Sequence, residues 1–236
     1  MTPRVAPPPQ QGNEPFPPGD YPLLVVGSGP GAIQVSYSLS RLGIEHAVIS
    51  RDDAPGGMFR RFPVFQRLLS WTKPYAPVDR GSRAYERYDW NSLLADEPEH
   101  RSLQPTFMDG SSEFPARSEM EANVAAFTER AGVRIRYGTA WESTRREDGP
   151  DGTRFVVETT AGEYRTPILV LAVGVAEPWS PSTTPGIELA RHYADTKPAE
   201  TYAGQRIFLI GKQVSAFELA TGLLPWACGI VLVSPS

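Results

Sequence analysis

An apolar run at residues 23–26 begins the first regular pattern of the chain and leads directly into a glycine-rich turn. Residues 33–42 then place apolar side chains at helical spacing, and this pattern stops at Gly43. A second apolar run, residues 44–49, follows at once. This order predicts a buried strand, a tight turn, a helix and a second strand parallel to the first.

The turn between the first strand and the helix has the sequence GSGPGA, which suits a dinucleotide pyrophosphate. Gly27 allows the tight turn, Gly29 lets phosphates approach the backbone, and Ala32 is small enough for the helix to pack on the strand. The start of the helix adds free N–H groups and a partial positive charge. The candidate phosphate-binding residues are Gly27, Gly29, Pro30, Gly31 and Ala32. The alternative is an ordinary glycine turn without a ligand.

The pattern of residues 118–132 predicts a further helix that packs on the sheet. Ser118 to Glu121 form a capping box at its start, and Gly132 marks its end. Its apolar face consists of Met120, Val124, Phe127 and Ala131.

Shorter alternating segments come after this helix. Residues 133–137 alternate as a strand does, and residues 141–146 and 153–160 flank the turn sequence DGPDG. These segments predict a small antiparallel meander attached to the parallel sheet.

A second strand, turn and helix are predicted near the end of the sequence. Residues 206–210 form the strand, residues 211–216 form the turn, and the helix runs to Leu224. Another strand begins at Ile230.

The second turn differs from the first at one decisive position. Gln213 stands where the first turn has Gly29, and its side chain is expected to obstruct the approach of a pyrophosphate. Lys212 adds a positive charge that partly compensates. Two interpretations stay open: a modified nicotinamide nucleotide site, and a packing turn that has lost its ligand.

Composition places the chain among ordinary globular proteins. Its 236 residues are 40% hydrophobic, enough for one large domain or two small ones. The net charge of −4 provides no basic surface for nucleic acid. No apolar run approaches the roughly 20 residues of a membrane span. We therefore expect small-molecule partners, no nucleic acid and no membrane.

The first 20 residues and the rare residue types bear on the compartment. Residues 1–20 are proline-rich and lack the charged and apolar regions of a secretion signal, so we expect a disordered leader and a cytoplasmic protein. Cys228 is the single cysteine, which excludes an internal disulfide and a CxxC redox pair. We expect it to be a buried packing residue. The histidines His46, His100 and His192 are scattered and predict no metal site.

The end of the second strand normally carries a carboxylate that holds the ribose of the nucleotide. Ser50 and Arg51 occupy that place here. A hydroxyl can hydrogen-bond a ribose and an arginine can accept a 2′-phosphate, so this position alone permits NADP. The pair Gly56 and Gly57 favours extended backbone beside a larger cofactor, with a surface turn as the alternative.

The turn GSGPGA followed by Gly56-Gly57-Met58-Phe59 resembles the flavin-binding region of flavin-dependent monooxygenases. This superfamily includes flavin-containing, Baeyer–Villiger and N-hydroxylating monooxygenases. Phe59 stands where the family usually has tryptophan, and Ser50 stands where it usually has glutamate.

Three later segments extend the resemblance over most of the chain. Residues 169–174 are similar to the family's LxLATG strand and turn. Residues 185–188 and His192 resemble its PGxE motif and linker histidine. The second turn resembles its NADPH-binding GxGxSA motif, in which Ser215 and Ala216 are preserved.

The resemblance implies an α/β protein. A Rossmann-like FAD-binding domain with a small antiparallel meander is expected over residues 21–185, and the beginning of a second Rossmann-like, NAD(P)-binding unit over residues 186–236. Trp141 is implied to lie beside the adenine. The implied cofactor-binding residues beyond the first turn are Ser50, Arg51, Gly56, Gly57, Met58, Phe59, Trp141, Ala172, Val173, Gly174, Gly211, Lys212, Gln213, Ser215 and Ala216.

The resemblance also implies a reaction. NADPH reduces FAD, and one oxygen atom from O₂ passes to an N, S or carbonyl-carbon centre of a small molecule. Because the flavin supplies this chemistry, the protein positions and shields it, and no catalytic acid or base has to be visible in the sequence. A disulfide reductase of similar fold is excluded by the single Cys228.

The aromatic-rich segment between Phe59 and Phe114 has little periodicity. We expect it to be ordered and to supply flavin-ring and substrate contacts. The alternative for Trp71 and Trp90 is that they fill core beneath the segment. Arg60 and Arg117 are candidate anion contacts, with solvated surface as the alternative.

Full members of the resembled family need the rest of the NADPH domain and a returning C-terminal segment. The sequence therefore predicts a fragment, a chain completed by a second chain or by self-association, or a shortened homologue. The main hypothesis is an FAD-dependent monooxygenase. The alternative is a non-catalytic nucleotide-binding homologue that acts in binding or assembly, which Ser50 and Gln213 favour.

Overall fold

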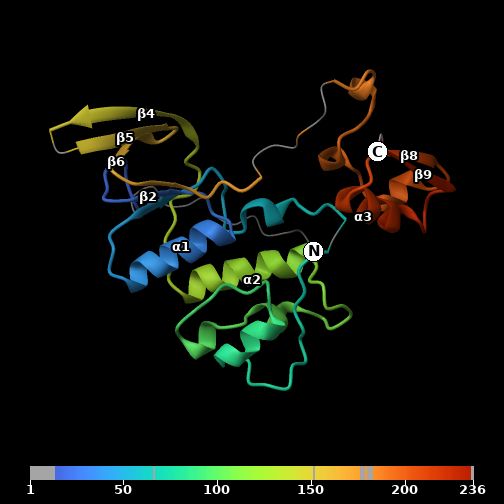
Figure 1. The fold of residues 1–236 in the computed structure, drawn as a ribbon, viewed down its shortest axis with the longest axis horizontal. Helices are drawn as coiled ribbons and strands as arrows, with labels where there is room; N and C mark the ends of the chain where they lie inside the picture. The colour runs from blue at the N-terminus through green and yellow to red at the C-terminus, as the bar shows by residue number, and fades with distance from the viewer. Residues whose placement is uncertain (1–13, 66, 151, 176–178, 180–182, 235–236) are drawn as a thin grey trace, which may run out of the picture. The chain divides into compact units, whose positions relative to one another are not determined.

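The structure is a computed structural model that describes residues 14–65, 67–150, 152–175, 179 and 183–234. It has the predicted α/β class, with parallel and antiparallel sheets (Figure 1). The described residues divide into two compact units. The first holds those up to Gly57 together with residues 124–174, and the second holds residues 58–123 and those from Val175 onward.

A parallel sheet with the strand order β3, β2, β7 forms the centre of the first unit. Its middle strand β2 (Leu24–Val26) pairs with β3 (Ala47–Ile49) on one side and β7 (Leu169–Leu171) on the other. Helix α1 (Pro30–Arg41) connects β2 to β3, because parallel neighbours need a crossover. The predicted strand, turn, helix and parallel strand are therefore confirmed, with shorter strands than the apolar runs.

The strand predicted at residues 133–137 is reduced to one parallel bridge between Arg136 and Ile49. Its backbone still follows the edge of β3, because Ser50 N–H donates to Arg136 O and Arg136 N–H donates to Val48 O. The prediction was wrong in extent and right in position.

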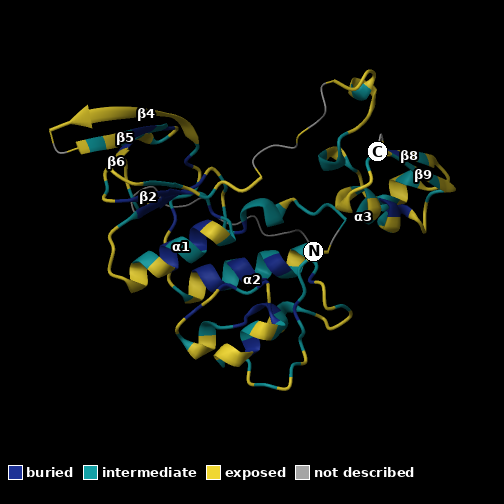
Figure 2. Ribbon diagram, in the orientation of Figure 1, coloured by how far each residue is buried: buried dark blue, intermediate teal, exposed yellow. Residues whose placement is uncertain are grey.

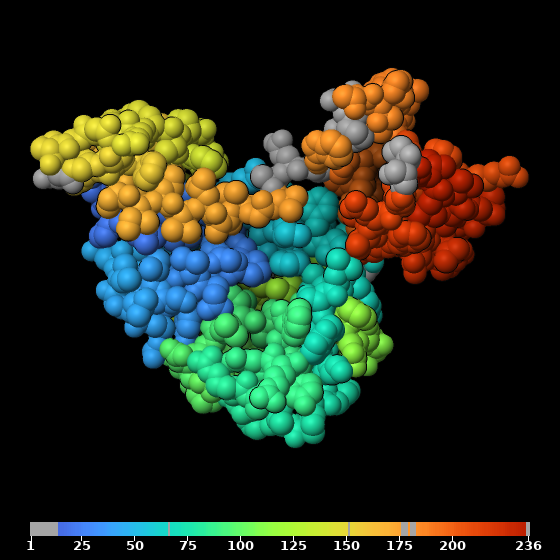
Figure 3. All heavy atoms as spheres, viewed as in Figure 1, coloured from blue at the N-terminus to red at the C-terminus, as the bar shows by residue number. Residues whose placement is uncertain are grey.

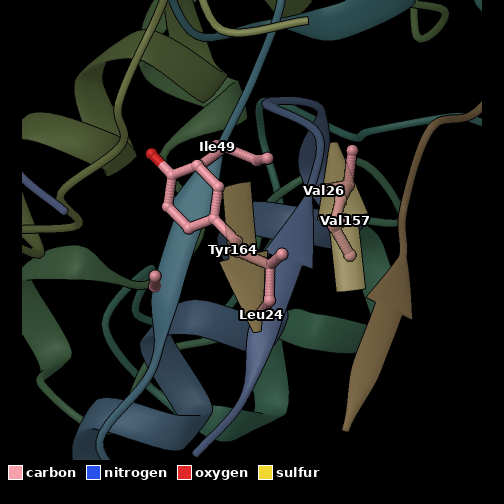
Figure 4. Packing of buried hydrophobic residues seen from close by; sticks show 6 residues of the cluster. Leu24, Val26, Ile49, Val157 and Tyr164 are labelled. Atoms are coloured by element: carbon pink, nitrogen blue, oxygen red, sulfur yellow. The ribbon is translucent and has the colours of Figure 1, made fainter. Parts of the chain in front are cut away.

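The core of the first unit lies between its two sheets. All residues of β2 and β3 are buried, as the dark blue of β2 in Figure 2 shows. Figure 4 shows Tyr164 and Val157 of the antiparallel sheet packed against Leu24, Val26 and Ile49. Continuous apolar runs suit strands that are covered on both faces.

The antiparallel sheet has the order β1, β6, β5, β4. Its strands are β1 (Gly19–Asp20), β4 (Trp141–Gly149), β5 (Gly152–Thr159) and β6 (Gly162–Thr166). The predicted meander is therefore confirmed, with β4 and β5 joined as the hairpin. Every residue of β4 is exposed, and the strand forms the yellow surface in Figure 3. Its charged side chains, among them Arg145 paired with Glu147 and Glu158, protect this edge against unwanted strand pairing.

Helix α2 (Arg117–Arg130) has the predicted apolar face, with Met120, Val124 and Phe127 buried. Its cap differs from the prediction. The helix begins before Ser118, so this serine lies in the first turn, and the Glu119 carboxylate accepts the backbone N–H of Ala116 at 2.7 Å. The capping box was therefore placed too late in the sequence.

A two-stranded parallel sheet belongs to the second unit. Strand β8 (Arg206–Ile210) leads into α3 (Val214–Leu223), and β9 (Gly229–Val233) returns beside β8. This second strand, turn and helix are as predicted. The sheet is largely open to solvent, with 62% of Phe208 and 54% of Val231 exposed.

The aromatic-rich segment of the second unit is built from turns and short 3₁₀ helices. These helices are η1 (Gly57–Arg60), η2 (Arg83–Tyr88), η3 (Pro98–His100) and η4 (Gln104–Phe107), with η5 (Ile187–Leu189), η6 (Tyr193–Asp195) and η7 (Ala199–Tyr202) later in the chain.

Two sequence-based expectations about single side chains are wrong. The ring of Trp90 lies 5.5 Å from that of Trp71 and is 68% exposed, so Trp90 does not fill core. Cys228 is exposed and not buried, because it follows the end of α3 and lies directly before the solvent-exposed β9.

Candidate functional site

Gly27, at the end of β2, lies against the end of β7. A Cβ atom at Gly27 would lie 2.4 Å from the carbonyl oxygen of Ala172, and the residue has a φ of +135°. Both the space and the backbone conformation therefore require glycine. The contact brings residues 172–174, a predicted cofactor-binding segment, to the first turn.

Gly29 and Gly57 are in backbone contact although they are far apart in sequence. A Cβ atom at Gly57 would lie 2.7 Å from the Cα of Gly29, and Gly57 has a φ of +56°. The N–H of Gly56 donates to the carbonyl of Ser28 at 2.9 Å. The two glycine motifs therefore form one surface of bare backbone, which a long dinucleotide can approach closely.

Helix α1 begins at this surface. Gly29 is its N-cap, Pro30 is its first residue, and no side chain caps this end. The first N–H groups of a helix have no acceptor within the helix, so they are available to an anion. Ala32 is fully buried and packs 3.5 Å from the position of a Cβ at Gly27, as its small size requires.

A relay of hydroxyl groups runs from the end of β3 to an acidic side chain. Ser50 Oγ donates to Ser28 Oγ at 2.9 Å, and Ser28 Oγ donates to Asp52 Oδ2 at 2.9 Å. The backbone N–H of Asp52 donates to Ser50 Oγ at 3.1 Å. Ser28 and Ser50 are buried, and Asp52 is half-buried.

This relay changes which residue can hold a ribose. The hydroxyl hydrogen of Ser50 is used by Ser28, so Ser50 has no proton to offer and is 3% exposed. Asp52 Oδ1 accepts from no described residue, and a carboxylate can accept from both ribose hydroxyls. Sequence reasoning missed Asp52 because it looked at the end of the strand, and only the fold places Ser28 between Ser50 and Asp52.

Trp141 is the first residue of β4, and its ring is 39% exposed. Its Nε1–H donates to Thr144 Oγ1 at 2.8 Å. The chain just before it is tied to the end of β3, because Thr139 N–H donates to Ser50 O at 2.8 Å. The structure therefore brings this segment to the relay, and the adenine contact of Trp141 stays a prediction.

Arg117 has a structural role within the second unit. Its Nη1 donates to the carbonyls of Arg60 at 2.8 Å and Phe59 at 3.2 Å, and it lies 3.5 Å from Glu121 Oε2. Arg60 also faces Glu121, at 3.9 Å. The expected anion contact of Arg117 is therefore wrong, because carbonyl oxygens and a carboxylate already occupy its guanidinium. Met58 and Phe59 lie on η1, half-buried.

The second turn repeats the backbone of the first with a different surface. Gly211 has a φ of +136°, and its N–H donates to Val233 O at 2.7 Å. Gln213 is the N-cap of α3 and is exposed, as are Lys212 and Ser215, while Ala216 is half-buried against Gly211. The Gln213 side chain thus stands at the helix end where the first turn presents bare backbone.

A pocket of about 720 Å³ opens beside this turn. One face of α3, formed by Val214, Phe217 and Thr221, lines it together with Leu68 and Phe114 of the aromatic-rich segment. Arg67 and Lys212 supply positive charge to its wall. The pocket is suited to a ligand with an apolar body and an anionic group.

Tyr193 connects three segments near this pocket. Its hydroxyl donates to Glu218 Oε2 at 2.7 Å and accepts the N–H of Val64 at 2.9 Å. Burial, strengthened by the Glu218 carboxylate, raises the pKa of Tyr193 to about 12. The predicted linker histidine, His192, accepts the N–H of Ala194 on Nδ1 and so caps η6.

Two searches of the described residues returned no site. No three His, Cys, Asp or Glu side chains there gather closely enough to hold a metal ion. No helix among these residues combines the length and apolarity needed to span a membrane.

The two strand–turn–helix units define a Rossmann-like dinucleotide-binding α/β protein. The sequence pattern of the pyridine nucleotide-disulphide oxidoreductase family matches residues 24–235, and the chain belongs to this family. FAD-dependent oxidoreductase domain-containing protein 2 of Mus musculus is 30% identical over 213 residues, which are 87% of this chain and 30% of that protein. The chain therefore spans less than a third of the length of this curated relative.

Solved structures show the same fold. A flavin-containing monooxygenase from Stenotrophomonas maltophilia has a TM-score of 0.70 at 18% identity, over 92% of this chain and 58% of that one. A bacillithiol disulfide reductase from Staphylococcus aureus has a TM-score of 0.67 at 17% identity, over 92% and 57%. A steroid monooxygenase bound to NADP has a TM-score of 0.59 at 19% identity, over 90% and 38%. The resemblance to flavin-dependent monooxygenases is thus confirmed in the fold.

Proposed function

We propose that this chain is the FAD-binding part, with a portion of the nicotinamide nucleotide site, of an FAD-dependent monooxygenase. The observation that carries the proposal is the backbone contact of Gly29 with Gly57 beside Gly27 and Ala172. Side chains are absent from this surface at the positions where a pyrophosphate and its flanking sugars have to approach. The bound FAD supplies the redox chemistry, and the protein residues bind, orient and shield it.

The first turn performs two tasks in this proposal. The N–H groups at the start of α1 bind the pyrophosphate, and Asp52 accepts the hydroxyls of the adenosine ribose. A 2′-phosphate would bring negative charge to Asp52, so this carboxylate disfavours NADP at the first turn. Arg51 is exposed and adjoins the same strand end. We therefore assign the first turn to FAD.

The second turn is proposed to bind NADPH in a modified way. Lys212 and the start of α3 attract the pyrophosphate, while Gln213 limits how closely it approaches. The pocket beside α3 accepts the remaining apolar and anionic parts of the nucleotide. The NADP-bound steroid monooxygenase of similar fold supports this proposal. The proposed substrate is a small molecule oxygenated at an N, S or carbonyl-carbon centre.

NADPH oxidation tests this function directly. The purified chain is loaded with FAD and assayed with amine, sulfide and ketone substrates, and we expect substrate-dependent NADPH oxidation and an oxygenated product. If FAD binds and NADPH oxidation is absent with all three classes, the monooxygenase proposal fails for this chain. A non-catalytic role in binding or assembly then takes its place, favoured by the exposed Gln213 at the second turn. The exclusion of a disulfide reductase stays a prediction.

A further inference from the structure

A group of buried amide and carboxylate side chains lies in the second unit, away from both glycine turns in sequence. Its members are Asp89, Asn91, Gln104 and Asn123, here called the Asp89 cluster. Asp89 is 7% exposed and Asn91 is 6% exposed, while Gln104 and Asn123 are fully buried. None of these residues has a role in the function proposed above.

Hydrogen bonds to residues 89–92 hold the cluster together. Asp89 Oδ1 accepts from Thr72 Oγ1 at 2.7 Å and from the N–H groups of Asn91 and Ser92 at 3.1 Å each. The N–H of Gln104 donates to Ser92 Oγ at 2.8 Å. Asn123 Nδ2 donates to the carbonyl of Asn91 at 3.3 Å.

Four polar atoms of the cluster have no partner among the described residues. They are Asp89 Oδ2, Gln104 Oε1, Gln104 Nε2 and Asn123 Oδ1. Buried polar atoms in native proteins almost always have a protein, water or ion partner, because an unpaired buried group is costly. So many on three neighbouring side chains indicate an occupant.

The charge and the oxygen atoms identify the kind of occupant. Among the described residues, no lysine, arginine or histidine forms an ion pair with Asp89. Its carboxylate therefore leaves one negative charge buried without a cation. Three of the four unpaired atoms are oxygens, the ligands that hard cations prefer.

We propose that the Asp89 cluster binds one monovalent cation of the Na⁺ or K⁺ class. Asp89 Oδ2, Asn123 Oδ1 and Gln104 Oε1 are the protein ligands. A single positive charge balances the single carboxylate. Ca²⁺ prefers six to eight oxygens, usually with several carboxylates, and suits this set poorly. The cation fixes residues 89–92 to Gln104 and to α2, which orders the aromatic-rich segment.

Thermal unfolding at constant ionic strength tests the site. The purified chain is melted in N-methylglucamine chloride, which is too large to enter, and in NaCl, KCl or RbCl. We expect one of the small cations to raise Tm in a saturable way, by about 5–10 °C at a concentration about 100 times its Kd. The Asp89→Asn variant should lose this dependence.

Glu147→Gln is the matched control, because it also removes one carboxylate, from the exposed ion pairs of β4. It should keep the full cation dependence. Equal Tm in all four salts overturns the proposal and leaves ordered water as the occupant, as does a dependence that persists in Asp89→Asn. If Asp89→Asn does not fold, ²⁰⁵Tl NMR of the unchanged chain decides: a bound thallium resonance displaced by K⁺ supports the site, and its absence overturns it.

Discussion

The first and second glycine turns share a backbone and differ in what surrounds it. Gly27 and Gly211 have φ angles of +135° and +136°, and each donates its N–H to the end of a neighbouring parallel strand. A Cβ at Gly27 would meet backbone at 2.4 Å, while at Gly211 the nearest atom is a side-chain carbon at 3.8 Å. The helix behind the first turn starts at Gly29, and the helix behind the second starts at Gln213.

The difference shows that a strand, turn and helix do not by themselves make a nucleotide site. Strand β2 has partners on both sides and is wholly buried, whereas β8 pairs with β9 alone and has one buried residue. The first turn gains its bare surface from β7 and from Gly57, which belong to distant parts of the sequence. Local sequence forms both turns, and the third strand with the second glycine pair makes one of them a site.

The largest expected effect comes from paired alanine substitutions. Both Gly27→Ala and Gly211→Ala force an L-residue into the same positive φ, which costs about 1–3 kcal/mol. Gly27→Ala adds a backbone clash, for a total of about 2–6 kcal/mol. Hydrogen exchange of the β2 and β8 amides measures the two losses separately. Equal losses would show that the surroundings of the turns do not differ in energy.

Removal of the Asp52 charge is expected to weaken FAD binding. In Asp52→Asn the ribose loses its charged acceptor, so the Kd for FAD should rise about 10- to 100-fold, the equivalent of about 1.5–3 kcal/mol. Fluorescence titration with FAD measures this change. The neighbouring, exposed Asp53 provides the control, and Asp53→Asn should bind as the unchanged chain does. Equal affinity of Asp52→Asn and Asp53→Asn would return the ribose contact to Ser50.

Gln213→Gly makes the second turn more like the first. Without the side chain, the pyrophosphate can approach the start of α3, and we expect NADPH affinity to increase about tenfold, or about 1.4 kcal/mol. Glycine is accepted at an N-cap, so the fold should remain intact. Calorimetric titration with NADPH gives the affinity. An unchanged Kd would mean that Gln213 does not obstruct the site.

The smallest effect concerns the Tyr193 contact of the second unit. The pKa of Tyr193 is raised from 10.0 to about 12 in the folded protein, so its contribution to stability is present below pH 10 and is lost as the pH rises toward 12. Tyr193→Phe should lower the free energy of unfolding by about 1 kcal/mol at pH 8. The difference between the two proteins should vanish near pH 12. A constant difference across this range, followed by urea unfolding, would contradict the assigned role of the hydroxyl.

Much of the fold follows from the sequence because its patterns are local. The apolar run of β2, the glycines of both turns and the hairpin sequence each determine a backbone conformation within a few residues. The apolar face of α2 was equally clear, although its cap lies at Ala116.

The details of the site depend on contacts between distant residues. The end of β3 carries a serine where a carboxylate is usual, and only the folded chain shows that Ser28 links it to Asp52. Arg117 could not be distinguished from an anion ligand until the carbonyl of Arg60 was placed against it. Hydrogen bonds that join separate segments leave no periodic trace in a sequence.

FAD binding by the unchanged chain and by Gly57→Val tests the central claim most directly. The purified proteins are titrated with FAD, and the chromophore released by denaturation is identified by its absorbance spectrum and mass. We predict one FAD per unchanged chain and no binding by Gly57→Val, whose side chain would press on the backbone of Gly29. A colourless chain that takes up no added FAD, or equal binding by the variant, would contradict the account.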